Sequence, residues 1–421
     1  MFLKDIELTN FKALENIYLS FETSSKRDPI RKTTFLLGQN GTGKSALLKA
    51  IALVTAGSSS LGNLLGSPDD WVKTGKKFCE IAATLLTAKG EERHIKLRIE
   101  KDFSLASIIS QNKESLELID NAIANADRNY FVIGYGASRR LNRDSQLVGA
   151  DFSSPRSLNI QSLFNPDAVL VSLTGWAMDL DYTQKGDGLR TVRKALDTFL
   201  VDNVRFKSID KTRKQLIFST PDGSVPLNQL SDGYQNVTAW VGDLMYRINE
   251  TFRDFKDPLK ARGLLLIDEI DLHLHPKWQR QLHAFLRNKL PNFQIIGTTH
   301  SPLTAQQADE GELYALTRTG RKIELVAFRG TPNKMLIHQI LMSPVFGLET
   351  DESVKIEEAK TKVRKIRSKG KVSAKDKSNI KKYSKILDAT PVNVRTNALL
   401  SSDDLELLRT INQELKSNKE S

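Results

Sequence analysis

Apolar and polar residues alternate in several short segments near the start of the chain. In residues 17–21 every second residue is Ile, Leu or Phe, and in residues 95–99 apolar residues are separated by charged ones. A period of two residues is typical of β-strands with one buried face. We therefore expect strands in the first forty residues and again across residues 78–100.

Four short runs rich in apolar residues predict buried strands, at 33–37, 130–133, 264–267 and 293–297. Strands that alternate with helices predict an α/β fold, in which helices flank a largely parallel central sheet. The segments of helical composition that alternate with these runs are 46–53, 189–201 and 278–288.

The chain divides into a long first part and a short basic end. The pattern predicts one domain over residues 1–350, with a small helical insertion at about 103–127 and a loop-rich stretch at 141–167. After residue 350 the strand patterns stop, and apolar residues recur at helical spacing, as in 402–415. We expect residues 351–421 to form a helical C-terminal region.

The composition is that of a folded, soluble protein. Hydrophobic residues make up 39% and charged residues 27% of the chain, which argues against wholesale disorder. No run of about 18 apolar residues occurs, so no transmembrane helix is expected. The first residues lack the apolar stretch of a signal peptide, and the single cysteine, Cys79, excludes an intrachain disulfide framework. We expect a cytoplasmic location and no membrane association.

Positive charge is concentrated in one segment. The net charge is +12, and residues 361–385 hold eleven Lys or Arg residues against one acid, Asp376. This segment is a candidate contact surface for an anionic partner such as nucleic acid, and a solvated helix surface is an equal alternative.

A glycine-rich segment between the predicted strand 33–37 and the predicted helix 46–53 matches the phosphate-binding P-loop pattern. Backbone N–H groups of such a loop converge on phosphate oxygens, and the following helix N-terminus adds a partial positive charge. Lys44 is expected to reach the β- and γ-phosphates of ATP, and Ser45 to ligate Mg²⁺. The predicted nucleotide-binding residues of this loop are Gly38, Asn40, Gly41, Thr42, Gly43, Lys44 and Ser45.

Two adjacent acids, Asp268 and Glu269, follow the apolar run 264–267. Carboxylates at the end of a buried strand are costly unless a cation or another partner pairs with them. A nucleotide with Mg²⁺ supplies that partner. Asp268 is expected near the metal, and Glu269 is expected to polarise the attacking water.

Two further segments are weak signals on their own. Residues 230–235 precede a predicted helix, so Ser231 or Asp232 fits its N-cap position. His300 follows the run 293–297, and a lone histidine is more often structural than functional. Neither segment indicates a function without the other motifs.

In their order along the chain, these motifs resemble those of the ATP-binding cassette (ABC) ATPases of the RecF and SMC lineage. The family's Asn-Phe-Lys element matches residues 10–12, which implies that Lys12 lies near the nucleotide. Its signature motif matches at Ser231 and Gly233, and its switch histidine matches His300. The resemblance implies an ABC-type ATPase head with a mixed, largely parallel central sheet, an antiparallel β lobe and a helical C-terminal appendix.

The same resemblance implies a mechanism. Two copies of the chain sandwich two ATP molecules, and each γ-phosphate meets the P-loop of one copy and the signature residues of the other. Lys44, Glu269 and His300 are the implied catalytic residues, and the implied metal ligands are Ser45 and Asp268. Assembly beyond the homodimer is left open. The family's glutamine loop has no clear match, because residues 135–139 occupy the expected region without a glutamine.

Three longer segments resemble a compact subgroup of this lineage that includes OLD-family ATPases and bacterial anti-phage ATPases. They are residues 134–140, 268–279 and 344–348. The chain is similar to the ATPase of Septu systems, including those attached to retrons. This implies an ATP-hydrolysing sensor or regulatory subunit of an anti-phage defence system that controls a nuclease partner. The alternative is a RecF- or SMC-like repair or chromosome-maintenance ATPase that binds DNA as an ATP-dependent dimer.

A nuclease site within the chain is not expected. Only about 90 residues follow residue 330, fewer than an OLD-type nuclease domain needs, and His338 is the only histidine after His300. The implied partner is therefore a separate HNH-type nuclease. The stretch 402–415 is a candidate docking helix for it, or else buries its apolar face against residues 352–368.

Three histidines, His273, His275 and His283, form a candidate zinc set. A zinc site needs at least three ligands in closed geometry. The D-loop of the ABC family, here residues 271–275, and the helix after it explain these histidines without a metal.

Overall fold

The computed structural model describes most of residues 1–388. The residues left out of that description are 26–27, 88, 140–154, 185–189, 191, 194–195, 198–199, 201–203, 253, 256, 349, 351, 369–372 and 389–421. The chain divides into two compact units, Met1–Gly347 and Leu348–Ser421.

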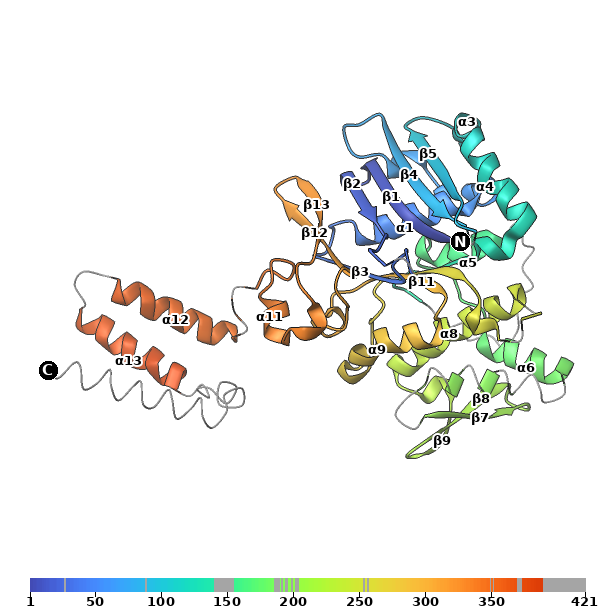
Figure 1. Ribbon diagram of the computed structural model, residues 1–421. Helices are drawn as coiled ribbons and strands as arrows, with labels where there is room; N and C mark the ends of the chain where they lie inside the picture. The colour runs from blue at the N-terminus through green and yellow to red at the C-terminus, as the bar shows by residue number, and fades with distance from the viewer. Residues whose placement is uncertain are drawn as a thin grey trace. The chain divides into compact units, whose positions relative to one another are not determined.

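A six-stranded mixed sheet forms the centre of the first unit (Figure 1). Five of its strands are parallel, and β13 pairs antiparallel with β12 at one edge. The four runs predicted as buried strands all lie in this sheet or overlap its strands. In spatial order the strands are β13 (Lys322–Ala327), β12 (Leu313–Thr319), β3 (Thr33–Gly38), β11 (Phe293–Thr298), β10 (Gly263–Ile267) and β6 (Val132–Tyr135).

An antiparallel lobe of four strands accompanies this sheet (Figure 1). The strands predicted from the alternating pattern in residues 17–21 and 78–100 are present in this lobe. Apolar residues of that pattern, Leu19, Leu97 and Ile99, are all buried. In spatial order the strands are β2 (Leu14–Ser20), β1 (Phe2–Phe11), β4 (Phe78–Leu86) and β5 (Glu92–Glu100).

Helices of the first unit connect these strands. Residues 105–126, within the expected helical insertion, form two of them, α3 and α4. The described helices are α1 (Lys44–Ala56), α2 (Ser58–Leu65), α3 (Leu105–Gln111), α4 (Lys113–Ala126), α5 (Pro155–Ile160), α6 (Leu173–Gln184), α8 (Asp232–Thr251), α9 (Pro276–Lys289), α10 (Pro302–Ala305) and α11 (Ile337–Leu341).

Alternate residues of the central strands enter two different hydrophobic cores. Leu36 of β3 packs in a core with α1 and the antiparallel lobe, whereas its neighbours Phe35 and Leu37 pack in a core with α8 and α9. Successive side chains of a strand point to opposite faces, so both faces of the central sheet are buried. The predicted α/β fold with a largely parallel sheet flanked by helices is confirmed.

The prediction of a loop-rich stretch at 141–167 is wrong for its second half. Residues 155–163 form α5 and a short 3-10 turn instead, because Pro155 suits the first position of a helix and Ile160 and Leu163 are buried. They pack so tightly over β6 that a Cβ on Gly134 would lie 2.3 Å from a Leu163 methyl carbon. The rest of that stretch up to residue 154 lies outside the described residues.

A small antiparallel sheet occupies residues for which no strand was expected. It contains β7 (Arg205–Asp210), β8 (Gln215–Thr220) and β9 (Gly223–Pro226). Phe206 and Phe218 are buried and lie opposite each other across the β7–β8 pair. The helix expected over 189–201 falls largely outside the described residues.

In the second unit the described residues form the helices α12 (Val354–Arg367) and α13 (Ala374–Asp388). Ala359, Val363 and Ile366 form a buried stripe on α12, and α13 packs against α12. The expected helix at 402–415 lies outside the described residues. Over the part of the chain that the structure describes, no helix is long and apolar enough to cross a membrane.

Candidate active site

The glycine-rich loop lies between β3 and α1, as a phosphate-binding loop requires. Gly41 and Gly43 have φ angles of 76° and 92°, a backbone conformation that L-residues with a side chain rarely adopt. A Cβ on Gly43 would also lie only 2.7 Å from a methyl carbon of Leu14. The turn therefore depends on glycine at position 43 for both conformation and space.

Lys44 is the first residue of α1 and is buried in this loop. Its Nζ donates hydrogen bonds to the carbonyl oxygens of Gly38, at 2.8 Å, and Gln39, at 3.1 Å. Burial lowers the pKa of Lys44, and the negative charges of Asp268 and Glu269 act in the opposite direction. The two acids therefore lie close enough to the lysine to interact with its charge.

Asp268 and Glu269 follow β10 directly, and Thr298 at the end of β11 holds both. The hydroxyl of Thr298 donates to Asp268 Oδ1 at 2.6 Å and accepts a hydrogen bond from the backbone N–H of Glu269 at 2.7 Å. Asp268 is buried, while Glu269 is partly exposed. Thr298 therefore orients both acids, the predicted metal ligand Asp268 and the predicted catalytic residue Glu269.

Glu269 has an unusual backbone conformation. Its φ angle is +48°, in the left-handed region that non-glycine residues seldom enter. Such strain is typical of functional positions that the surrounding structure holds in place. Here the turn directs the backbone away from β10 immediately after Asp268.

His300 follows β11 and lies within the influence of the same charges. Burial lowers the pKa of His300, as does the positive charge of Lys44, whereas Glu269, Asp271 and Asp268 raise it. The side chain nevertheless remains largely exposed. Lys44, Asp268, Glu269 and His300 thus all follow the carboxyl ends of neighbouring parallel strands, β3, β10 and β11, and their charges influence one another.

Lys12 lies in the turn after β1. Its Nζ donates to the carbonyl oxygen of Asp70 at 2.9 Å and lies 4.2 Å from the ring centroid of Trp71. Burial lowers the pKa of Lys12, and the charge of Lys49 lowers it further. Burial lowers the pKa of Lys49 as well, and the charge of Asp268 acts in the opposite direction.

Ser231 and Gly233 occupy a different surface. Ser231 is the exposed N-cap residue of α8, and a Cβ on Gly233 would lie 2.8 Å from the carbonyl oxygen of His273. They line an open pocket of about 840 Å³ together with His273, His275 and Trp278, and no residue of the P-loop lines it. The signature residues and the P-loop therefore do not share this pocket.

The zinc interpretation finds no support in the geometry of these histidines. His283 is buried in α9 with Nε2 at 2.9 Å from an Oε2 of Glu312, while His275 Nδ1 accepts a hydrogen bond from the backbone N–H of Lys277. Over the described residues, no group of three or more His, Cys, Asp or Glu side chains is arranged to hold a metal ion.

Two arginines of the site had no role in the sequence analysis. Arg318 of β12 donates to the carbonyl oxygen of Gly41 at 2.9 Å. Arg139 is buried and donates to the carbonyl oxygens of Asp268, at 2.7 Å, and of Glu269. The one sequence signal that could have identified Arg139 as a site residue is its place in the 134–140 motif, after a strand. No sequence signal identified Arg318 as a site residue.

The donors present fit a nucleotide with Mg²⁺. Asp268 and Ser45 offer the carboxylate and hydroxyl oxygens that Mg²⁺ prefers. The loop offers an ammonium group, glycines without side chains and the N-terminus of a 13-residue helix, which together form a site for phosphate.

A P-loop, two strand-end acids and a histidine on neighbouring parallel strands define a P-loop nucleotide-binding protein with an ABC-type head. The chain belongs to the family described as "AAA domain, putative AbiEii toxin, Type IV TA system", which matches residues 33–305. This membership and the similarities below confirm the resemblance stated from the motifs.

Several curated proteins are similar to this chain over most of its length. The chain is 29% identical over 353 residues to the Septu protein PtuA of Bacillus mycoides (strain KBAB4), an alignment that covers 82% of this chain and 45% of that protein. It is 27% identical over 339 residues to the Septu protein PtuA of Bacillus thuringiensis, covering 75% of each. It is 24% identical over 406 residues to the Retron Vc95 probable ATPase of Vibrio cholerae serotype O1 biovar El Tor, covering 78% and 76%. The chain thus spans less than half the length of the first of these relatives.

Among solved structures, an SMC head bound to the C-winged helix domain of ScpA has a similar fold. The TM-score is 0.50 at 16% identity, and the match covers 78% of this chain and 98% of that one. At this identity the similarity supports the ABC-type fold alone.

Proposed function

We propose that this chain binds ATP with Mg²⁺ and hydrolyses it as a homodimer. The observation that supports this most strongly is that Lys44, Asp268, Glu269 and His300 follow the carboxyl ends of neighbouring parallel strands and influence one another's charge. In the proposed reaction Lys44 leaves the loop carbonyls and binds the β- and γ-phosphates. Ser45 and Asp268 would hold Mg²⁺, which would supply positive charge close to the phosphate oxygens.

Glu269 and His300 act on the attacking water in this proposal. The carboxylate of Glu269 accepts a hydrogen bond from the water and polarises it, as the positioned group does in other phosphoryl-transfer enzymes. Burial and the charge of Lys44 lower the pKa of His300, which favours the neutral ring, and a neutral ring offers one nitrogen as a donor and the other as an acceptor. It orients the water or the γ-phosphate without adding charge.

The homodimer explains why the signature residues lie on a separate surface. Ser231 and Gly233 line a pocket without P-loop residues, so they are free to meet the γ-phosphate bound by a second copy. Dimerisation therefore depends on bound ATP.

Two variants test this mechanism. Glu269→Gln keeps Asp268 for the metal but removes the polarising carboxylate, so it should bind ATP, hydrolyse it far more slowly and accumulate as an ATP-bound dimer. Lys44→Ala should instead weaken nucleotide binding and stay monomeric. The measurement is light scattering in saturating ATP and Mg²⁺, and a monomeric Glu269→Gln protein would refute the mechanism.

We further propose that the ATPase is the sensor or regulatory subunit of an anti-phage defence system and controls an HNH-type nuclease in trans. The names of the relatives, Septu protein PtuA and retron probable ATPase, support this role. In this proposal the ATPase domain spans residues 1–350, and the helical region 351–421 is available for contacts with a partner.

Co-expression with the neighbouring open reading frame tests the partner. We expect a stable complex in a pull-down and DNA cleavage that is low while ATP is bound and rises when the nucleotide state changes. A chain that purifies alone and binds or bridges DNA unaided would contradict this proposal.

A DNA-binding dimer related to RecF and SMC proteins is the second candidate, and the charges of α13 favour it. Lys377, Lys381 and Lys385 lie one helical turn apart and are exposed, so they form a positive stripe that suits a phosphate backbone. Replacing all three with Glu should then weaken duplex DNA binding. The slope of log K against log salt concentration should fall in magnitude by about one unit for each lost phosphate contact. Unchanged DNA binding by this variant would argue against contact through α13.

A further inference from the structure

Residues 135–139, the end of β6 and the turn after it, contact two parts of the site. One is α8, the signature helix, whose N-cap residue is Ser231 and which contains Gly233. The other is the acid turn, formed by Asp268 and Glu269.

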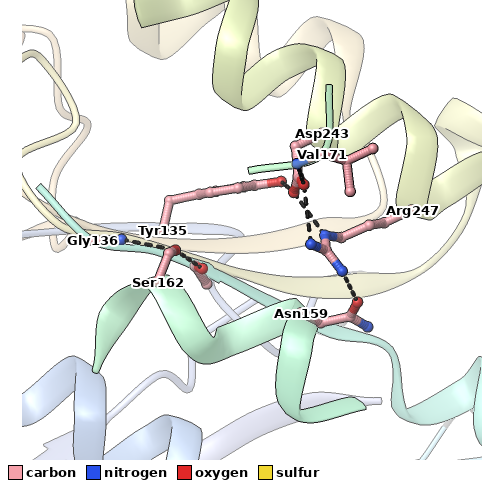
Figure 2. Close-up of polar contacts among 8 residues, drawn as sticks. Tyr135, Gly136, Asn159, Ser162, Val171, Asp243 and Arg247 are labelled. Carbon is pink, nitrogen blue, oxygen red and sulfur yellow. Dashed lines mark hydrogen bonds and ion pairs between the residues drawn. The ribbon is translucent and has the colours of Figure 1, made fainter. Parts of the chain in front are cut away.

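Tyr135 is the last residue of β6 and its side chain points toward α8, where its hydroxyl donates to Asp243 Oδ2 at 2.8 Å (Figure 2). The backbone carbonyl oxygen of the same tyrosine accepts a hydrogen bond at 2.8 Å from the N–H of Asp268. One residue therefore connects α8 to the start of the acid turn.

The α8 end of this connection is held firmly. Arg247 donates to both oxygens of Asp243, at 2.7 and 3.0 Å, and to Asn159 of α5 at 2.8 Å (Figure 2). The backbone N–H of Val171 donates to Asp243 as well, at 2.9 Å. Because Asp243 is fully buried and has these partners, it is a fixed anchor for the Tyr135 hydroxyl.

The other end of the segment is Arg139. Its Nε donates to the carbonyl oxygen of Gly136 at 3.1 Å, which holds the guanidinium against its own turn. One terminal nitrogen, Nη2, donates to the carbonyl oxygens of both Asp268 and Glu269.

These two carbonyls belong to the two peptide planes on either side of the Glu269 Cα atom. Holding both planes fixes the φ and ψ angles of Glu269, since each peptide unit is itself rigid. The residue is in the left-handed region, with φ of +48°, and would relax from it if the planes were free. The direction of its carboxylate depends on those angles.

We propose that Arg139 is a positioning residue that holds Glu269 in its left-handed turn, and that Tyr135 and Arg139 tie this turn to the signature helix α8. The inference rests on the proposed ATP hydrolysis. It assigns a role to residues 135–139, the region where the sequence offered no glutamine.

A role for Arg139 in packing alone would not need its charge. An apolar residue would fill the same space with less loss of solvation free energy, because burying a guanidinium is unfavourable. The rigid guanidinium of Arg139 donates from Nε to its own turn at Gly136 and from Nη2 to the two carbonyl oxygens at the same time. The single ammonium of lysine, on a flexible stem, does not reproduce this arrangement. Substitution with lysine therefore keeps the charge while releasing one or both peptide planes.

Arg156 supplies a matched control. It also donates to two backbone carbonyl oxygens, those of Thr55 and Tyr130, both at 2.7 Å. It lies on α5 and touches neither the P-loop nor the acid turn in these contacts. Arg156→Lys should lower the melting temperature and leave the rate of ATP hydrolysis per folded molecule unchanged.

The experiment measures steady-state ATP hydrolysis and the Kd of a fluorescent ATP analogue in the full-length protein. For Arg139→Lys we expect kcat to fall about 10- to 100-fold, as is usual when the support of a catalytic group is lost, with the Kd of the analogue unchanged. If Arg139→Lys fails to fold, Tyr135→Phe decides the question. It keeps the ring and should lower kcat at unchanged Kd by a smaller factor.

The outcomes separate the two proposals. No hydrolysis by the wild-type protein overturns both the proposed function and this inference. If the wild type is active, the inference alone is overturned when Arg139→Lys keeps the wild-type kcat, or when Arg156→Lys lowers kcat by the same factor. If Arg139→Lys does not fold, a Tyr135→Phe variant with the wild-type kcat overturns the inference.

Discussion

Backbone strain at single residues is concentrated in the motifs of this protein. Six described non-glycine residues have φ between 48° and 63°, and four of them are Asn10, Lys12, Glu269 and His273. Each of these four lies in a segment that the motifs had marked. Strain persists only where neighbouring contacts hold it, and the contacts of Lys12 with Trp71 and of Glu269 with Thr298 and Arg139 do so.

Gly43 offers a test of the loop at this scale. In Gly43→Ala the new methyl group meets Leu14 at 2.7 Å and φ is 92°, so we expect ATP-analogue affinity to fall about tenfold or more, from strain of about 1–3 kcal/mol plus the clash. Gly41→Ala is the control, since φ is 76° but no atom lies within 4 Å of its Cβ. Equal losses in the two variants would show that the contact with Leu14 has no part in the effect.

His300 should make the stability of the nucleotide-free protein depend on pH. Its pKa is lowered in the folded state by burial and by Lys44, so the unfolded chain binds the proton more readily. The stabilising contribution is complete above the ordinary pKa of about 6.5 and is lost as the pH falls through the folded-state pKa.

His300→Gln tests this dependence without nucleotide or added Mg²⁺. We expect the melting temperature of the wild-type protein to fall more steeply between pH 7.5 and pH 5.5 than that of the variant. Parallel slopes would mean that other groups account for the acid sensitivity.

At the scale of elements, the site depends on which strands are neighbours. β10 lies between β6 and β11, so the turn after it is held from one side by Thr298 and from the other by Tyr135 and Arg139. β12 lies beside β3 and brings Arg318 to the P-loop. The catalytic geometry is therefore a property of the sheet order and not of any one element.

Asp243 is the residue through which α8 and β6 depend on each other. Asp243→Asn leaves the buried guanidinium of Arg247 without its counter-charge, so we expect a loss of about 3–5 kcal/mol in the free energy of unfolding. Tyr135→Phe removes one hydrogen bond from the same carboxylate and should cost only about 1 kcal/mol. Urea unfolding monitored by circular dichroism measures both, and a smaller loss for Asp243→Asn than for Tyr135→Phe would contradict the account.

At the scale of the whole molecule, the two hydrophobic cores and the candidate active site lie entirely within the first unit, Met1–Gly347. The second unit has its own buried stripe on α12 and contains the basic segment 361–385, with eleven Lys or Arg residues against one acid. The basic segment and the candidate active site thus belong to different units of the chain.

Truncation after Gly347 should therefore leave a folded protein that binds ATP with the affinity of the full chain. The measurement is a melting curve together with titration of the ATP analogue. An insoluble product, or one without ATP binding, would show that residues beyond 347 complete the fold of the first unit. A soluble product that no longer dimerises with ATP would instead assign the second unit to the dimer.

The P-loop, the two acids and the central strands could be predicted because each is contiguous in sequence. The P-loop motif is recognised from the spacing of Gly38 to Ser45 alone. The apolar run before Asp268 predicts a buried strand whichever strands it pairs with. Pattern failed at α5, where a segment rich in turn residues forms a helix because its Ile160 and Leu163 cover β6. It also failed to identify β7–β9 as strands.

The sequence by itself determined the kind of chemistry: a loop for phosphate, acids for metal and water, and a basic end. Only the tertiary structure decided how the acids are held, because Thr298 is 30 residues from Asp268 and Arg139 is 129 residues from it. Such contacts follow from the order in which distant strands pair, which local pattern does not encode. The turn of Glu269 is strained, and a strained conformation exists only when groups from elsewhere in the chain hold it.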